Sequence, residues 1–302
     1  MGRILTLANG LFVILLIIGG LGYTGGQAGS GYLLALTGLL EVIYLLRSFL
    51  TKDLEKVKTA GDVTAVILLL LLVWQVVTAQ LHLVDKMLFP APGEVIALLI
   101  ADLPELLKGL ASSLELLAAG YFLALLVAIP LALFIGWRKR LYNMVNPFTK
   151  VLGPVPPIVY IPYAIALLPT FKASSIFVIF IGAFWPVFIN TLSGVFNVEK
   201  RLVDTARALN VGEVTMLFRI ILPGALPAIM SGATLGLVMS FILLTSAEMI
   251  GATSGLGWYV KNFSDFADYP RVIVGIIFIG AVVTVITVVF EKLEKYLLRW
   301  KH

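Results

Sequence analysis

The chain has 302 residues, of which 60% are hydrophobic and only 13% are charged. A soluble domain carries about 25% charged residues, so this composition excludes a water-soluble globule of this size. There is no cysteine and there are two histidines, His82 and His302. These counts exclude disulfides and thiolate metal sites, and they argue against any metal centre or imidazole acid–base site.

Apolar stretches long enough to cross a membrane as a helix, about 20 residues, recur along the whole chain. The sequence therefore predicts an all-α integral membrane protein with about eight transmembrane helices. The first stretch follows Met1-Gly2-Arg3 and could be a signal peptide, but it lacks a convincing cleavage site, so we interpret it as an anchor helix. The predicted spans are residues 4–22, 31–48, 63–84, 114–137, 149–169, 174–196, 223–247 and 271–291.

The basic residues are distributed unevenly between the connecting segments. If both termini are cytoplasmic, all but five of the 22 lysines and arginines lie on the inner side of the membrane. Cytoplasmic loops are enriched in these residues, so this orientation is predicted. It also accounts for the net charge of +5 without any nucleic-acid partner. The five residues on the outer side are Lys86, Lys108, Lys172, Lys261 and Arg271.

Two segments interrupt the apolar pattern in the first third of the chain. Residues 47–62 are polar, and we interpret them as a partly helical cytoplasmic linker that separates a two-helix hairpin from the other six spans. The predicted modules are residues 1–58 and residues 59–302. On the outer side, residues 89–94 break the chain, and residues 94–110 alternate apolar and acidic positions at helical spacing. This second pattern predicts an interfacial helix.

The fifth apolar stretch is unusually rich in proline. Each interior proline removes a backbone hydrogen bond and clashes with the preceding turn. Broken backbone at membrane depth is tolerated only where protein or a water-filled cavity shields it. We therefore expect this stretch to line an internal pathway, although a kinked helix buried among its neighbours would show the same pattern. The prolines are Pro154, Pro156, Pro157, Pro162 and Pro169.

A polar loop between the sixth and seventh spans predicts a short helix lying crosswise at the cytoplasmic surface, at about residues 199–210. Leu202, Ala206 and Leu209 share one face at helical spacing. Asn210 is suited to a left-handed cap at the end of this helix. A second helix is expected to follow and to continue into the seventh span. Such a crosswise element can insert into a groove on a partner.

This loop resembles the "EAA" loop of ABC-importer permeases. Asp204-Thr205-Ala206, Asn210 and Ile220-x-Leu222-Pro223 match its pattern without a gap, with Asp for Glu, Thr for Ala and Asn for Gly. The resemblance covers about residues 88–300 and favours the nitrate, sulfonate, taurine and bicarbonate branch, whereas the first two spans look like an added hairpin. The other similar segments are Leu88–Pro92, Gly153–Pro157, Phe184–Pro186, Asn190-Thr191 with Gly194, Ala247–Gly251 and Gly255–Gly257.

The resemblance implies a type I permease with a six-helix core, located in a prokaryotic inner membrane. Two permease copies would pair, each docking its loop helix on one copy of a separate ATPase, and an extracellular or periplasmic solute-binding protein would deliver the cargo. ATP and Mg would belong to the ATPase, because this chain has no Gly-x4-Gly-Lys-Ser/Thr loop, no cofactor and no predicted catalytic residue. The implied coupling residues are Asp204, Thr205, Ala206, Arg207, Leu209 and Asn210.

Polar residues within the spans are candidates for the translocation pathway. Glu248, at the outer end of the seventh span, is expected to face the interior because an ionised carboxylate is costly in lipid. It lies beside the pathway, as in the family, or it makes a structural hydrogen bond that ties the following turn to the helix end. The neutral candidates could equally join helices to one another. The predicted pathway residues are Tyr160, Tyr163, Asn190, Thr191, Ser240, Ser246 and Glu248.

Other functions and several substrates stay open at this point. A proton-coupled secondary transporter would use Glu248 and need no ATPase, whereas an embedded enzyme is disfavoured because no carboxylate pair, Cys or His is placed for acid–base chemistry. Glu41 is expected to pair with a polar group or to stay hydrated, and Glu115 to be interfacial. Small oxyanions lead as cargo, although residues 168–172 depart from the family pattern, and a vitamin precursor or another small metabolite remains an alternative.

Overall fold

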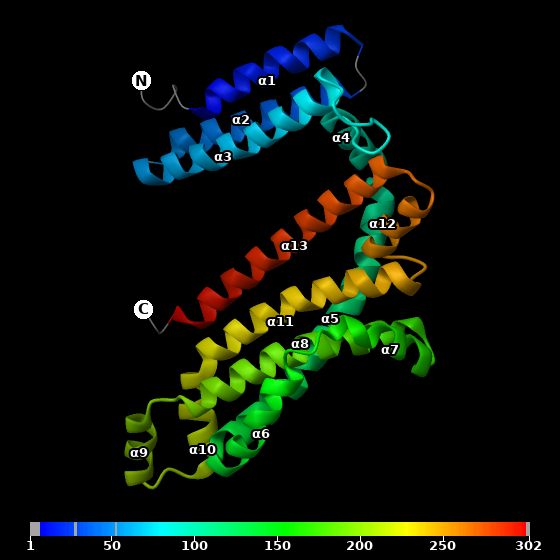
Figure 1. Ribbon diagram of the computed structural model, residues 1–302. Coiled ribbons are helices and arrows are strands. Elements are labelled where there is room, and N and C mark those ends of the chain that lie inside the picture. Colours follow the sequence, from blue (N-terminus) through cyan, green and yellow to red (C-terminus); the bar gives the residue numbers. More distant parts are fainter. Residues whose placement is uncertain (1–6, 27–28, 52, 300–302) are drawn as a thin grey trace. The chain divides into compact units, whose positions relative to one another are not determined.

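The structure, a computed structural model, describes residues 7–26, 29–51 and 53–299 (Figure 1). All regular secondary structure in these ranges is helical. Among the described residues, seven helices are long and apolar enough to cross a membrane, and one bent pair of helices gives an eighth candidate. The predicted all-α membrane fold is therefore confirmed. The described residues do not include the start of the first predicted span. They also do not include four of the residues named above, Arg3, Lys52, Lys301 and His302.

The chain divides into two compact units, Met1–Glu105 with Val260–Phe278, and Leu106–Tyr259 with Ile279–His302. The first unit contains α1 (Leu7–Thr24), α2 (Ser30–Leu50), α3 (Leu54–Gln75, continued by the π-helical η1, Val76–Gln80) and α4 (Pro92–Ala101). Helix α1 packs against both α2 and α3, and the three lie side by side in Figure 1. The placement of a module boundary near residue 58 stays a prediction.

The polar segment at residues 47–62 is mostly helical. Helix α2 continues to Leu50, and α3 already begins at Leu54. The carboxylate of Asp53 accepts hydrogen bonds from the backbone N–H groups of Glu55 and Lys56, which caps the new helix. The expected partly helical segment thus consists of the end of one helix and the capped start of the next, and its role as a cytoplasmic linker stays a prediction.

Residues 94–110, predicted as one interfacial helix, are divided between two helices. Helix α4 ends at Ala101, and α5 (Leu103–Trp137) begins two residues later, so the second half of the expected element belongs to a 35-residue helix. Helix α4 approaches the start of α2 so closely that a Cβ on Gly93 would lie 2.3 Å from the carbonyl oxygen of Gly29. Only glycine fits at these two positions.

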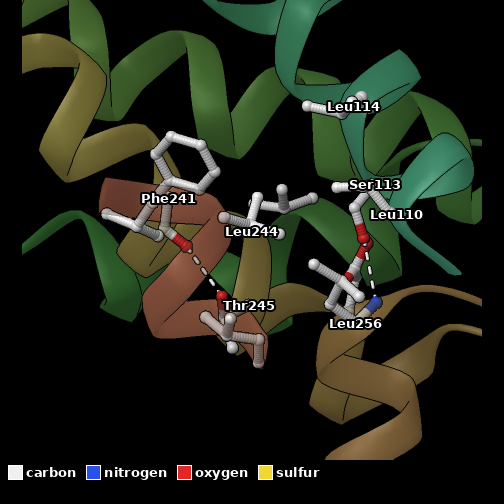
Figure 2. A pocket seen from close by; sticks show the side chains of 11 residues that line it. Leu110, Ser113, Leu114, Phe241, Leu244, Thr245 and Leu256 are labelled. Carbon is white, nitrogen blue, oxygen red and sulfur yellow. Dashed lines mark hydrogen bonds between the residues drawn. The ribbon is translucent and has the colours of Figure 1, made fainter. Parts of the chain in front are cut away.

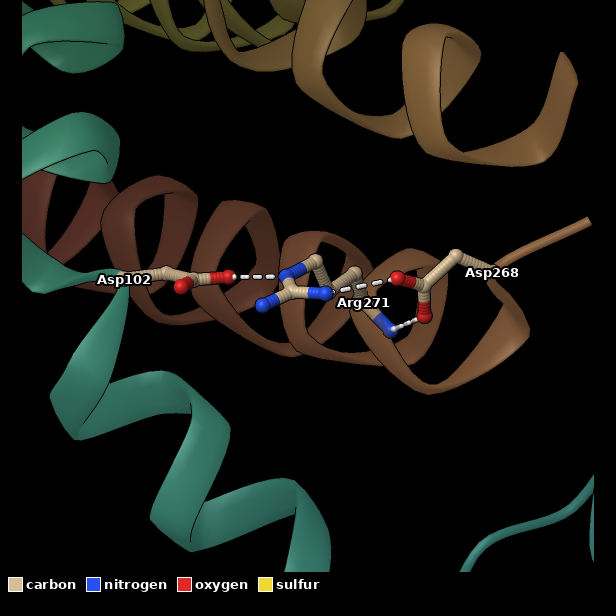
Figure 3. Close-up of polar contacts among 3 residues, drawn as sticks. All are labelled: Asp102, Asp268 and Arg271. Atoms are coloured by element: carbon tan, nitrogen blue, oxygen red, sulfur yellow. Dashed lines mark hydrogen bonds and ion pairs between the residues drawn. The ribbon is translucent and has the colours of Figure 1, made fainter. Parts of the chain in front are cut away.

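An ion cluster joins the end of α4 to the start of α13 within the first unit (Figure 3). The Nε–H of Arg271 donates to Asp102 Oδ2 at 2.7 Å, and its Nη1–H donates to Asp268 Oδ2 at 2.7 Å. The same guanidinium lies over the ring of Phe263. Two carboxylates on one guanidinium fix the direction in which α13 leaves the preceding turn.

Within the described residues, the most extensive contact between two helices lies in the second unit. Helix α8 (Phe171–Phe196) packs along α11 (Leu222–Gly251) through small residues that let the two backbones approach (Figure 1). A Cβ on Gly232 of α11 would lie 2.9 Å from the carbonyl oxygen of Pro186 on α8. The remaining elements assigned wholly or partly to this unit are α5, α6 (Lys139–Leu152), η2 (Pro157–Tyr160), α7 (Ile161–Leu167), α9 (Lys200–Ala208), α10 (Glu213–Met216), η3 (Leu217–Ile221), α12 (Leu256–Asp265) and α13 (Tyr269–Leu297).

We expect Gly232→Val to destabilise the α8–α11 pair strongly. Overpacking of a tight interface costs about 1–3 kcal/mol, and here the obstacle is a helix backbone that cannot rotate away. Thermal unfolding of the purified chain in detergent should show a Tm lower by several degrees. Gly280→Val is the matched control, because a Cβ on Gly280 of α13 meets no atom within 4 Å. Equal stability of the two variants would contradict the proposed packing role.

The proline-rich span is broken, as its composition indicated. Helix α6 and the segment Pro157–Leu167 meet at an angle of 81°, and the break falls at residues 153–156. The helical part begins at Lys139, ten residues before the predicted start of the span. The predicted N-terminal limit was therefore wrong, because α6 is too polar to be recognised by hydropathy.

Candidate functional site

The short crosswise helix between the sixth and seventh spans is present as α9 and ends abruptly. Asn210 has a positive φ of 54°, so its predicted left-handed conformation is confirmed. Its N–H donates to the carbonyl of Arg207 at 2.9 Å, and the N–H of Val211 donates to the carbonyl of Ala206 at 3.0 Å. These two bonds form a Schellman motif, which satisfies the last carbonyls of the helix and turns the chain back.

The side chains of α9 divide between the protein interior and its surface. Ala206 is 4% exposed and belongs to an apolar cluster with residues of α5, α8, η3 and α11. Leu202 and Leu209, expected on the same face, are 50% and 72% exposed. Ala206 therefore anchors the helix to its own bundle, and an arginine at this position would disrupt packing before it affected any partner.

The other residues implied in coupling lie on the surface. Asp204 and Thr205 are exposed, and Arg207 places its guanidinium 5.6 Å from the ring centroid of Trp137 at the end of α5. A cation over an indole face stabilises the pair electrostatically. The exposed side of α9 thus combines two leucines with polar groups of both signs, while Ala206 and the contact of Arg207 with Trp137 hold the helix to the bundle.

Two predicted pathway residues share a hollow. Tyr160 and Tyr163 line an apolar space of about 510 Å³ at the broken span, together with residues of α7 and α8. Tyr163 is exposed on its surface. The break therefore borders a hollow whose walls are partly exposed, and the pathway role of Tyr160 and Tyr163 stays a prediction.

The other neutral candidates do not line that hollow. The amide of Asn190 donates to the carbonyl of Pro186, and the hydroxyls of Ser240 and Ser246 donate to carbonyls one turn earlier in α11. Ser240 and Thr191 are fully buried. The Oγ1 atom of Thr191 has no hydrogen-bond partner within the described ranges. These contacts favour helix packing for Thr191 and Ser240, whereas their predicted pathway role stays a prediction.

Glu248 closes a hydrogen-bonded latch between the three helices α5, α11 and α12. Its carboxylate, 1% exposed, accepts from the hydroxyl of Ser113 on α5 at 2.6 Å and from the N–H of Gly257 at 2.7 Å. Figure 2 shows the second contact of Ser113, whose oxygen accepts from the N–H of Leu256 at 2.9 Å. The carboxylate thus caps the first turn of α12, where negative charge is favoured. The hydrogen bond that ties the turn to the helix end is therefore present, whereas the pathway role of Glu248 stays a prediction.

The turn before α12 is shaped around this carboxylate. Gly255 has a φ of 132°, and a Cβ there would lie 2.4 Å from Glu248 Oε1. The cavity beside the latch has a volume of only about 10 Å³ and is otherwise lined mainly by apolar residues of α5, α11 and α13. This volume is close to that of one water probe, so cargo does not fit there.

Ser113 was missed by sequence reasoning. It lies 135 residues before Glu248, and a single sequence carries no signal for such a pairing.

The other two carboxylates predicted within or beside the spans differ in their surroundings. Glu115 forms an exposed ion pair with Lys172, whereas Glu41 is buried in the first unit and its Oε2 atom has no hydrogen-bond partner in the described part of the chain.

Comparison with known proteins shows that the chain is similar to transport permeases. Residues 120–301 match the family described as binding-protein-dependent transport system inner membrane component. The chain is 31% identical over 238 residues to the taurine transport system permease protein TauC of Escherichia coli, covering 76% of this chain and 86% of that protein. It is 32% identical over 235 residues to a putative aliphatic sulfonates transport permease protein of Bacillus subtilis, covering 76% and 84%.

A further relative and a solved structure extend these matches. The nitrate import permease protein of Synechocystis is 33% identical over 171 residues, which is 57% of this chain and 62% of that protein. The MetNI methionine ABC transporter, in an inward-facing conformation, has a TM-score of 0.56 at 16% identity, covering 65% of this chain and 97% of the matched chain. At this identity the structural likeness shows the fold alone.

Proposed function

Because this chain belongs to the family of inner membrane components of binding-protein-dependent transport systems, as a permease subunit of an ABC importer, we propose that α9 is the helix on which a separate ATPase acts. The observation that carries the proposal is the arrangement of this helix. Buried Ala206 holds the helix against the bundle and the Schellman motif ends it sharply, while Leu202 and Leu209 remain exposed. A rigidly anchored helix with an apolar outer side is suited to transmit movement from a partner's groove.

The assembly and orientation follow from the same proposal. Two ATPase copies would bind two permease copies, with a solute-binding protein on the opposite side of a prokaryotic inner membrane. Both termini would be cytoplasmic, as the charge bias supports. The chain itself would be non-catalytic, since ATP and Mg would be bound by the ATPase.

We propose a small oxyanion as the cargo. The relatives named for taurine, nitrate and aliphatic sulfonates support this class. Nitrate and sulfonates share a compact group with three oxygens and a delocalised negative charge. Neutral donors would bind such a group weakly enough to release it.

The test is uptake into proteoliposomes that contain this chain, the ATPase that co-purifies with it and the cognate binding protein. We expect uptake of radiolabelled taurine, ethanesulfonate or nitrate to require internal Mg-ATP and to continue when an ionophore collapses the pH gradient. Uptake by this chain alone in ATP-free vesicles under a pH gradient would contradict the proposal and support proton coupling.

A further inference from the structure

A second hollow lies on the inner side of the break in the proline-rich span, between α6 and α8. Its volume is about 480 Å³. Three of its lining residues, Tyr142, Asn146 and Lys150, follow each other at intervals of four along α6 and therefore share one face of that helix. Ser193 lines it from α8. Within the described ranges no carboxylate lines this space, and Lys150 is the one charged residue that does.

The break itself forms part of the wall. Gly153 and Pro154 line the hollow directly after the end of α6. A Cβ on Gly153 would lie 2.8 Å from Ile189 of α8, so the broken segment passes close to that helix. Interrupted backbone of this kind is found where protein or a water-filled cavity shields it. The position of the hollow is thus the one at which a span is expected to border an aqueous pathway.

The side chains around this space include one ammonium and several neutral groups that can donate hydrogen bonds. The ammonium of Lys150 offers three N–H groups, and Asn146 and Tyr142 add an amide and a phenolic O–H. The ring of Tyr142 is stacked on Phe196 with centroids 3.8 Å apart, which fixes its direction. Ser193 already accepts a hydrogen bond from the amide of Asn197, so its own O–H is available to donate. No carboxylate in the described residues pairs with Lys150.

We propose that this hollow, which we call the α6 hollow, is an anion site that binds the oxyanion group of the cargo in the inner half of the pathway, with Lys150 supplying the charge. The inference rests on the proposed function and deepens it. A single cation among neutral donors attracts an anion without holding it as tightly as a paired arginine fork would. The phosphate of an anionic lipid has the same chemistry, so the experiment has to distinguish the two sources.

Because this chain has no cysteine, a single introduced thiol can be labelled selectively. Ser193→Cys places one thiol in the α6 hollow, and Met144→Cys places one on an exposed part of α6 away from the Tyr142–Lys150 face. Each variant, as purified transporter in phosphatidylcholine nanodiscs, is labelled with sulfonatoethyl and with trimethylammonioethyl methanethiosulfonate. Labelling of this chain is followed by mass spectrometry, so cysteines of other subunits do not interfere.

We expect the anionic reagent to be favoured over the cationic one about fivefold more at position 193 than at position 144, the size of effect that one nearby charge produces in water. Lys150→Gln in the Ser193→Cys background should remove this preference, and Lys150→Arg should retain it. Taurine, ethanesulfonate or nitrate at millimolar concentration should slow labelling at position 193 and not at position 144.

Three results would overturn the inference. Equal charge preference at the two positions would exclude an anion site, and a preference that survives Lys150→Gln would exclude Lys150 as its source. Protection by phosphatidylglycerol in the nanodiscs, without protection by the soluble anions, would assign the hollow to lipid phosphate instead. Since labelling needs no transport, a lost preference with intact ATP-driven uptake refutes only the α6 hollow, whereas absent uptake with intact preference refutes only the proposed function.

Discussion

Leu209→Asp is expected to reduce ATP-driven uptake strongly while leaving the permease folded. Leu209 is 72% exposed at the end of α9 and makes no contribution to the buried cluster that holds Ala206. In the proposed complex it would enter an apolar part of the ATPase groove. Burying an unpaired carboxylate costs several kcal/mol, and about 1.4 kcal/mol already corresponds to a tenfold weaker complex. Uptake and co-purification of the ATPase should therefore both fall by about tenfold or more.

The measurement compares three variants in proteoliposomes, with Tm in detergent as the check on folding. Leu209→Ala should have an intermediate effect, because it removes apolar area without adding charge. Tyr296→Asp is the matched control, since Tyr296 is an exposed apolar residue near the end of α13, on the side also expected to be cytoplasmic. An unchanged ATPase complex in Leu209→Asp, or an equal loss in Tyr296→Asp, would remove α9 from the coupling role.

Several features of the fold could be predicted from residues that lie close together in the sequence. The apolar stretches located the spans because helix length is set by membrane thickness. The proline cluster indicated a broken span, and Asn210 at the end of a short amphipathic pattern indicated a left-handed cap. Each of these conclusions depends on a few neighbouring residues, so one sequence was sufficient.

The errors arise where local composition and structure differ. Asp53, followed by an acidic residue in the first turn, is a helix-start signal, but the polar composition of residues 47–62 did not show where α3 begins. Likewise, α6 was missed as an extension of the broken span because its polar face lowers its hydropathy. A prediction based on apolar length alone therefore misses or shortens amphipathic helices at a membrane boundary.

Contacts distant in sequence could not be predicted. Helical spacing places Leu202, Ala206 and Leu209 near one another, but it does not show which of them meets the bundle. The same holds for Glu248, whose partner Ser113 lies on another helix. A helical period defines faces, whereas the neighbours of each face depend on the packing of the whole chain.

Removal of the Glu248 latch is expected to have the second large effect, on stability more than on transport chemistry. Glu248→Ala leaves the hydroxyl of Ser113 and the N–H of Gly257 without their acceptor in a buried place. Each buried group left unpaired costs about 1–3 kcal/mol. Thermal unfolding in detergent should therefore show a Tm lower by several degrees in Glu248→Ala, with a smaller decrease in Ser113→Ala.

Glu248→Gln separates a structural latch from a proton carrier. The carbonyl of a glutamine can accept from the N–H of Gly257 while its amide donates to the hydroxyl oxygen of Ser113, so most of the stability should remain. Uptake driven by ATP should also remain, because no proton has to bind at this position. A stable Glu248→Gln variant that has lost all uptake would contradict the latch and return Glu248 to the pathway.

The double variant Ser113→Ala with Glu248→Ala should lower the free energy of unfolding by less than the sum of the two single changes, since the two side chains share one network.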